Sequence, residues 1–139
     1  MLFTFSNTSQ TLVTDQLLTF NNNTIQTGCT ATHAAGSSSI SLNKAGYYMV
    51  SFNADGVESG TAGNITIQLQ GNGTAIAGAE TTAESATATD VVNLSFTTLV
   101  QVCPNCCGNQ VNTPFTLTFA NTGVGATFTN AAVTVTKVA

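Results

Sequence analysis

Apolar and polar residues alternate along most of the chain, and residues 39–56 show the pattern most clearly. Ile40 and Leu42 alternate with polar residues, and Tyr48, Val50 and Phe52 do so again after a Lys-Ala-Gly turn. Alternation with a period of two is characteristic of half-buried β-strands. We therefore expect two strands in this segment, the second of which ends at the Asp-Gly pair of residues 55–56.

The second of these strands carries large side chains on both faces. Tyr47 and Met49 fall on the opposite face from Tyr48 and Val50, because successive side chains of a strand point to opposite sides of the sheet. A strand of this kind is expected in the middle of a sheet, with other groups packed against each face.

The rest of the alternation predicts about ten short strands and no helix. Asn72-Gly73 between two such segments is a strong hairpin signal, and residues 11–20 read as a strand broken by a bulge. Loops are expected at residues 57–63 and 103–113, and an exposed loop or sheet edge at residues 79–89, where the apolar periodicity is lost. The other expected strands are one with Phe3 and Phe5, a weak edge strand at 24–33, and the segments 65–69, 74–78, 92–102, 115–119 and 128–138. The fold class is therefore all-β, an antiparallel sandwich or jelly roll.

The composition narrows the class of protein and of partner. The 139 residues are expected to form one domain (1–139), with residues 1–10 as an N-terminal arm or edge strand. Only 6% of the residues are charged, against roughly 25% in ordinary domains, and a surface of small neutral polar residues is typical of extracellular, virion or coat proteins. Two lysines, no arginine and a net charge of -4 exclude an electrostatic footprint for nucleic acid or for an anionic membrane.

The sequence also bears on membrane insertion and on secretion. No apolar run reaches the roughly 20 residues that a membrane-spanning helix needs. The first residues have neither the basic segment nor the continuous apolar segment of a secretory signal peptide. We therefore expect the protein to be made in a cytosol and to reach its destination by assembly or lysis.

The order of motifs resembles a known family. Gly46, Tyr48, Val50 and Phe52 form a Gly-Tyr-Tyr-x-Val-x-Phe strand after an x-Ile-x-Leu strand, and the chain closes on Phe-x-Asn-Ala-x-Val-x-Val with Phe128, Asn130, Val133 and Val135. This order, over residues 11–138, resembles the tumour-necrosis-factor-like and complement-head-like jelly rolls. Among them it is most similar to bacterial and phage members related to the C-terminal domain of the Bacillus exosporium glycoprotein BclA. The resemblance implies a ten-strand sandwich that forms a homotrimer with one sheet facing the threefold axis, here without a collagen-like stalk.

The strand pattern gives a separate reason to expect self-association. A single two-sheet sandwich covers one face of each sheet, so the second set of apolar residues on a strand such as 46–56 would remain exposed. A closed cyclic interface between copies would cover that set. The candidates for the trimer interface or the core are Tyr47, Tyr48, Met49, Phe96, Phe115, Phe119 and Phe128.

The cysteines form the most specific local motif in the sequence. Cys103 and Cys106 form a C-x-x-C pair next to Cys107, and Cys29 with His33 forms a C-x3-H pair that could complete a Cys3His zinc site with them. Disulfide bonds, within or between subunits, and free thiols are the alternatives, and a reducing cytosol favours free thiols. Thiol redox catalysis needs a helix N-terminus to lower the thiol pKa, and none is expected here.

No catalytic constellation is expected. His33 is the sole histidine, and its spacing from the scattered Asp residues suggests no oriented base or oxyanion hole. The sequence therefore favours a non-enzymatic structural or recognition protein without a cofactor, a jelly roll on a phage virion that serves as a capsid decoration or fibre head. Alternatives are a spore-coat, exosporium or bacterial cell-surface protein and, less favoured, a small zinc-dependent hydrolase. Expected partners are further copies of the chain, capsid or coat proteins, and a cell-surface glycan if the aromatic residues form a sugar platform rather than packing inside.

Overall fold

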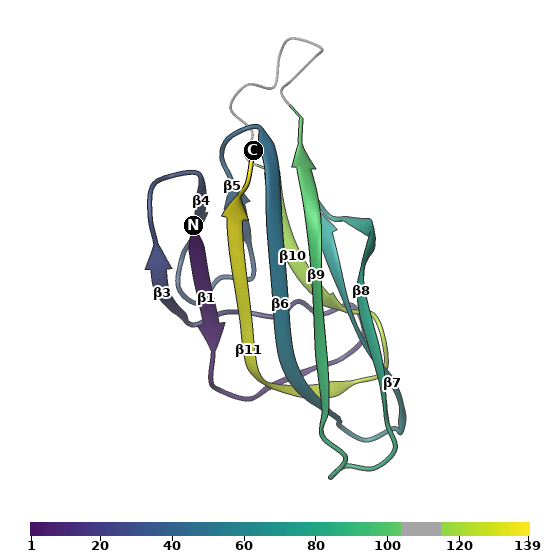
Figure 1. Cartoon of the computed structure of the whole chain (residues 1–139). Coiled ribbons are helices and arrows are strands. Elements are labelled where there is room, and N and C mark those ends of the chain that lie inside the picture. The colour runs from purple at the N-terminus through teal and green to yellow at the C-terminus, as the bar shows by residue number, and fades with distance from the viewer. Residues whose placement is uncertain (104–114) are drawn as a thin grey trace.

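A computed structural model describes residues 1–103 and 115–139, and in these residues two antiparallel sheets pack face to face (Figure 1). The described part is built of strands, turns and bends, so no described helix could cross a membrane. The strands are β1 (Leu2–Ser6), β2 (Gln10–Leu12), β3 (Asn22–Gln26), β4 (Ala31–His33), β5 (Ile40–Leu42), β6 (Gly46–Glu58), β7 (Gly63–Gly71), β8 (Thr74–Ser85), β9 (Val92–Val102), β10 (Phe115–Asn121) and β11 (Ala126–Lys137).

The strand order of each sheet follows a jelly-roll path. The first sheet has the order β3-β1-β11-β6-β9, with β2 pairing to the far end of β11, and the second has the order β4-β5-β10-β7-β8. Every pairing is antiparallel, and the chain repeatedly crosses from one sheet to the other. The sequence prediction of an all-β antiparallel sandwich is confirmed.

β6 is an interior strand of the first sheet, with a paired strand on each side, as its two-faced pattern predicts. It pairs with β9 over eleven residues without a break and with β11 on its other side. The β11 register shifts between Thr129 and Ala132, where Asn130 has a φ of +53° in a β-bulge. The bulge lies beside the Asp55-Gly56 pair of β6. β6 does not end at this pair as expected but continues to Glu58. Packing favours glycine at position 56, because a Cβ there would lie 3.2 Å from the Phe128 ring.

The core lies between the sheets and is organised by stacked aromatic rings. Phe52 of β6 stacks on Phe119 of β10 with ring centroids 4.9 Å apart and an interplanar angle of 20°. Phe20 meets Phe119 edge-to-face at 5.8 Å, and Phe96 packs beside Phe52 at 5.5 Å. These contacts join interior strands of the two sheets, β6 and β10. Offset or edge-to-face aromatic pairs add to the free energy gained by area burial.

Of the two alternatives for residues 79–89, a loop or an edge, the edge is observed for most of the segment, because residues 79–85 belong to β8, the edge strand of the second sheet. The strand runs to Ser85, and its inner positions are small: Ala79 and Ser85 are fully buried, and Ala83 packs against the core. Glu80 and Glu84 point outward between them. The period of two is therefore present, but Ala, Thr and Ser carry it, and a count of large apolar residues does not detect it. The real loop covers residues 86–91.

Two N-terminal expectations are also wrong. Residues 11–20 form only the short β2, after which Leu17 makes a single bridge to Ala120. The backbone of Thr19 is instead held by the Gln10 side chain, whose amide donates to the Thr19 carbonyl at 2.7 Å and accepts from the Thr19 N–H at 2.8 Å. The expected edge strand at 24–33 is two strands, β3 and β4, which belong to different sheets.

The boundaries of the remaining strands and loops lie closer to those expected from the sequence. β1, inside the expected arm at 1–10, pairs with β11 on one side and β3 on the other. The hairpin at Asn72-Gly73 is confirmed, and both residues have the positive φ of a type I′ turn, +50° and +82°. The expected loop at 57–63 shrinks to residues 59–62, and the loop expected at 103–113 lies outside the described residues except for Cys103.

The aromatic stack gives a stability prediction. Phe119→Ala should lower the free energy of unfolding by about 3–5 kcal/mol, the range for removing a buried aromatic ring, because it deletes contacts to Phe20, Phe52 and Phe96. Val91→Ala, in the exposed loop before β9, should change it by less than about 0.5 kcal/mol. Urea unfolding measures both, and a Phe119→Ala cost below about 1.5 kcal/mol would contradict this description of the core.

Candidate functional site

The most distinctive surface is the outward side of the first sheet, which we call the outer face. It consists of the outward positions of β1, β3, β6, β9 and β11, with β11 in its middle and β6 and β9 on one side of β11 (Figure 1). Tyr47, Met49, Leu99 and Ile25 are exposed there by 47%, 40%, 63% and 41%. Phe3 and Phe5 lie half-buried on the same face, with ring centroids 5.9 Å apart.

The register shows that these side chains form connected groups across the strands. Met49 pairs with Leu99 on one side and Thr136 on the other, and Phe3 pairs with Ile25. Side chains of directly paired residues lie within contact distance. The strand between the two groups is β11, whose outward residues there are the small and neutral Ala132, Thr134 and Thr136. The outward positions of this part of the outer face carry no charged side chain.

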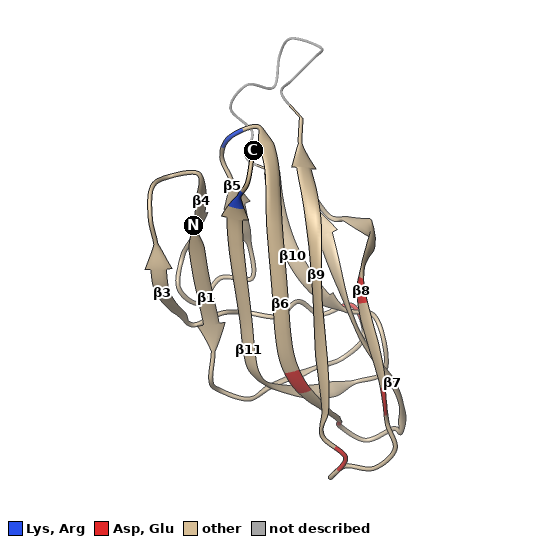
Figure 2. Ribbon diagram, viewed as in Figure 1, with Lys and Arg blue, Asp and Glu red and all other residues tan. Residues whose placement is uncertain are grey.

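Asp55 is the one charged residue at the described outward positions of these strands. Figure 2 shows an acidic segment low on β6 and the basic segments near the opposite end of the sheet. Its carboxylate accepts hydrogen bonds from the Asn93 side-chain amide of β9 at 3.2 Å and from that of Asn130 at 3.5 Å. Asn93 also donates to the Asn53 side chain at 2.7 Å. This belt of one carboxylate and three amides marks the polar lower end of the outer face.

Adjacent tyrosines show the two sides of β6. Tyr47 is exposed on the outer face, whereas Tyr48 is fully buried and its hydroxyl donates to the Lys44 carbonyl at 2.6 Å. Burial raises the pKa of Tyr48 above its ordinary value of 10.0, and the hydrogen bond to Lys44 acts in the opposite direction more weakly. Tyr48 is therefore a structural residue of the core.

The structure separates the predicted interface or core candidates into three groups. Tyr48, Phe119 and Phe128 are buried in the core, Phe96 and Phe115 are partly buried against it, and Tyr47 and Met49 are exposed on the outer face. A sugar platform that combines these aromatic residues is wrong, because Tyr48 and Phe119 have no exposed surface for a ligand to stack on. Leu99 and Ile25 belong to the outer face although sequence reasoning did not select them; their place follows only from the strand order.

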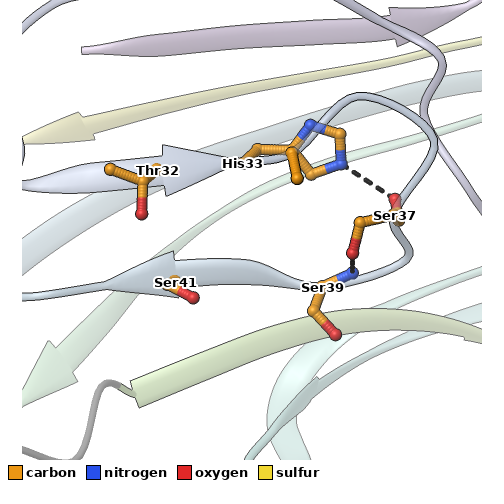
Figure 3. A pocket seen from close by; sticks show the side chains of 6 residues that line it. Thr32, His33, Ser37, Ser39 and Ser41 are labelled. Carbon is orange, nitrogen blue, oxygen red and sulfur yellow. Dashed lines mark hydrogen bonds between the residues drawn. The ribbon is translucent and has the colours of Figure 1, made fainter.

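His33 lies at the end of β4 beside a shallow depression of about 390 Å³ lined by Thr32, Ala34, Ser37, Ser39 and Ser41 (Figure 3). The ring is 6% exposed. Its Nε2 is 2.8 Å from the Ser37 carbonyl oxygen, and its Nδ1 is 2.6 Å from Asn23 Oδ1. Both ring nitrogens are thus occupied by structural contacts.

The expected zinc set is not brought together in the described residues. No three His, Cys, Asp or Glu side chains cluster within residues 1–103 and 115–139. Cys29 and Cys103 are exposed free thiols, and the nitrogens of His33 face oxygen atoms. Cys106 and Cys107, with any disulfide that would involve them, lie outside the described residues.

Comparisons with known proteins identify the fold. No protein-family model matches the sequence, and no curated protein is similar to it in sequence. Murine APRIL at pH 5.0 is similar in structure with a TM-score of 0.57 and 6% identity over 99% of this chain and 98% of that chain, and at pH 8.5 with 0.55 and 7% over 99% and 97%. The PRD1 vertex protein P5 is similar with a TM-score of 0.52 and 12% identity over 99% and 96%. These likenesses show that the chain has the tumour-necrosis-factor-like jelly-roll fold.

The buried Tyr48 hydroxyl predicts how stability depends on pH at the alkaline end. Because its pKa is raised in the folded chain, the stability that its neutral form contributes is fully present below about pH 10 and is lost as the pH rises through the folded-state pKa. Tyr48→Phe should remove this part of the alkaline loss, whereas Tyr47→Phe should leave it unchanged. Urea midpoints measured on both sides of pH 10 test this, and equal effects of the two substitutions would contradict it.

Proposed function

We propose that this chain is a non-enzymatic structural protein that associates with itself as a homotrimer and is displayed on the surface of a virion. The outer face is the contact surface between copies. The loops at the ends of the sandwich are left free for capsid proteins or for recognition. The observation that carries the proposal is the broad uncharged outer face, which one copy leaves exposed.

The composition of the outer face supports burial against another copy. Burying a large apolar side chain fully contributes about 1.5–3 kcal/mol, and four such side chains are exposed on this one face. Large apolar patches left exposed on a soluble protein usually mark an interface. A rotationally symmetric ring would cover the same surface on every copy and leave none exposed at its ends.

The placement on a particle rests on two further observations. Only 6% of the residues are charged, so the polar surface consists of neutral Thr, Ser, Asn and Gln side chains. The PRD1 vertex protein P5 is among the similar folds. Purification of intact particles with the chain attached, or its gene among capsid genes, supports a virion component; a gene among spore-coat genes supports a coat or cell-surface protein instead.

The contacts that His33 and Asp55 already make within the protein support a non-enzymatic role. His33 makes structural contacts through both ring nitrogens, and the carboxylate of Asp55 is engaged by amides. General acid-base catalysis needs a group within reach of a substrate proton. His33 lines a shallow depression, but oxygen atoms of the protein already contact both of its ring nitrogens.

Leu99→Asp tests the contact surface directly. A carboxylate at a 63% exposed position should be tolerated by a single copy but strongly disfavoured between copies. We expect sedimentation velocity to show monomers for Leu99→Asp at micromolar concentration. Val91→Asp, equally exposed but in the loop before β9, is the matched control and should remain trimeric. An unchanged oligomer for Leu99→Asp would place the interface elsewhere.

Asp55→Asn tests whether the lower end of the outer face also belongs to the interface. Burial between copies would cost free energy for desolvating the Asp55 carboxylate, so its neutral isostere should strengthen association by roughly tenfold, about 1.4 kcal/mol. Asp15→Asn, which removes the same charge in an exposed turn far from the outer face, should have no comparable effect. The dissociation constants of both variants decide it: weakened or unchanged association of Asp55→Asn excludes this end from the interface.

A further inference from the structure

Two amide side chains of β3 hold the backbone of His33, the last residue of β4. The Asn23 side-chain amide donates to the His33 carbonyl oxygen at 2.6 Å, and the Gln26 side-chain carbonyl accepts from the His33 N–H at 3.0 Å. A backbone carbonyl only accepts and a backbone N–H only donates, so the two contacts fix which end of each amide faces β4. They connect β3, at the edge of the first sheet, to β4, at the edge of the second (Figure 1).

The backbone groups of His33 point away from the rest of the second sheet. In an antiparallel pair, residues that exchange hydrogen bonds with the partner strand alternate with residues whose N–H and C=O face the other way. The Thr30 carbonyl accepts from the Asn43 N–H at 2.8 Å, toward β5. Thr32 therefore also faces β5, and His33 faces the free side of β4, whose one neighbour in the sheet is β5.

The two amides supply what a neighbouring strand would supply. At such a position the next strand of a sheet gives one donor and one acceptor, and Asn23 and Gln26 give one of each. Gln10 acts in the same way on Thr19, because its single amide binds both the carbonyl and the N–H of that residue, at 2.7 and 2.8 Å. Side-chain amides thus take the place of strands at two positions of this chain.

An irregularity in β3 brings both amides to the same side. Asn23 and Gln26 are three residues apart, and in a regular strand such side chains point to opposite faces. Thr24 is an extra residue in the pairing with β1, because Asn23 and Ile25 pair with consecutive residues of that strand. The extra residue reverses the alternation, so that both amides reach β4.

The edge at β4 lacks the usual protection of sheet edges. Soluble proteins commonly protect an edge strand with charged side chains or proline, but β4 and residues 34–39 contain no Asp, Glu, Lys, Arg or Pro. β8, at the other edge of the second sheet, presents Glu80 and Glu84 outward and has an irregular register. The amides of β3 occupy the β4 edge, where such charges are missing.

We propose that Asn23 and Gln26 close the free edge of β4 against pairing with a strand of another chain. Unpaired N–H and C=O groups at a sheet edge are a template for strand addition. With both groups of His33 already bonded, an incoming strand has to displace two hydrogen bonds. Self-association through this edge is thereby disfavoured. The contact acts within one copy, so it does not depend on the trimer or on display.

Removing both amides tests the proposal. For Asn23→Ala combined with Gln26→Ala, we expect the circular dichroism of a β-sheet protein, a severalfold rise in thioflavin T fluorescence, and light scattering from species larger than the wild-type assembly whose share grows with concentration. Asn21→Ala is the matched control, because its amide binds the Ser6 and Thr8 hydroxyls and not β4; it should keep the wild-type mass. A double variant of wild-type mass at every concentration would overturn the proposal.

A rescue variant separates an open edge from a general loss of stability. Ala34→Lys places a charge at the exposed position directly after β4, where lysine opposes strand addition without restoring the lost hydrogen bonds. Added to the double variant, it should return the mass to the wild-type value. Val91→Lys, the same charge in the exposed loop before β9, should not, although both triple variants should keep the lowered urea midpoint of the double variant. Equal suppression by the two lysines, or by neither, would overturn the proposal.

Discussion

The structure depends on the burial of one face of β6 against the second sheet. Tyr48, Val50 and Phe52 point inward from a strand that has β11 on one side and β9 on the other. The stack of Phe52 on Phe119 then fixes the second sheet against the first. Because side chains alternate, the same pairing that buries these residues necessarily presents Tyr47 and Met49 on the opposite side. The apolar outer face is thus a direct consequence of how the core is built.

Much of the fold could be predicted from the sequence where large apolar side chains carry the period. β5, β6 and the Asn72-Gly73 hairpin are examples, because each follows from local alternation or turn chemistry. The second part of β8, residues 79–85, could not be found in this way, since its buried positions are Ala and Ser, and the gain from each is small. The split of residues 24–33 into β3 and β4 is a matter of which sheet each half joins, and that choice is decided by distant strands.

In the candidate sites, too, some residues follow from the local sequence pattern and others only from the pairing of distant strands. The two-faced pattern predicts that Tyr47 and Met49 need a partner surface, but Leu99 and Ile25 join them only through the order β3-β1-β11-β6-β9. His33 appears in the sequence as a possible zinc ligand beside Cys29. Its actual partners, Asn23 and Ser37, have no spacing signal, because the fold and not the sequence brings an amide and a carbonyl to its two nitrogens.

The account therefore rests on an outer face that one copy of the chain cannot cover. The most direct test is the mass of the unmodified protein in solution, measured by light scattering or native mass spectrometry over a range of micromolar concentrations. The account predicts a species of three times the 14.2 kDa chain mass that persists on dilution through this range. A monomer at every concentration, with the outer face open to solvent, would contradict it.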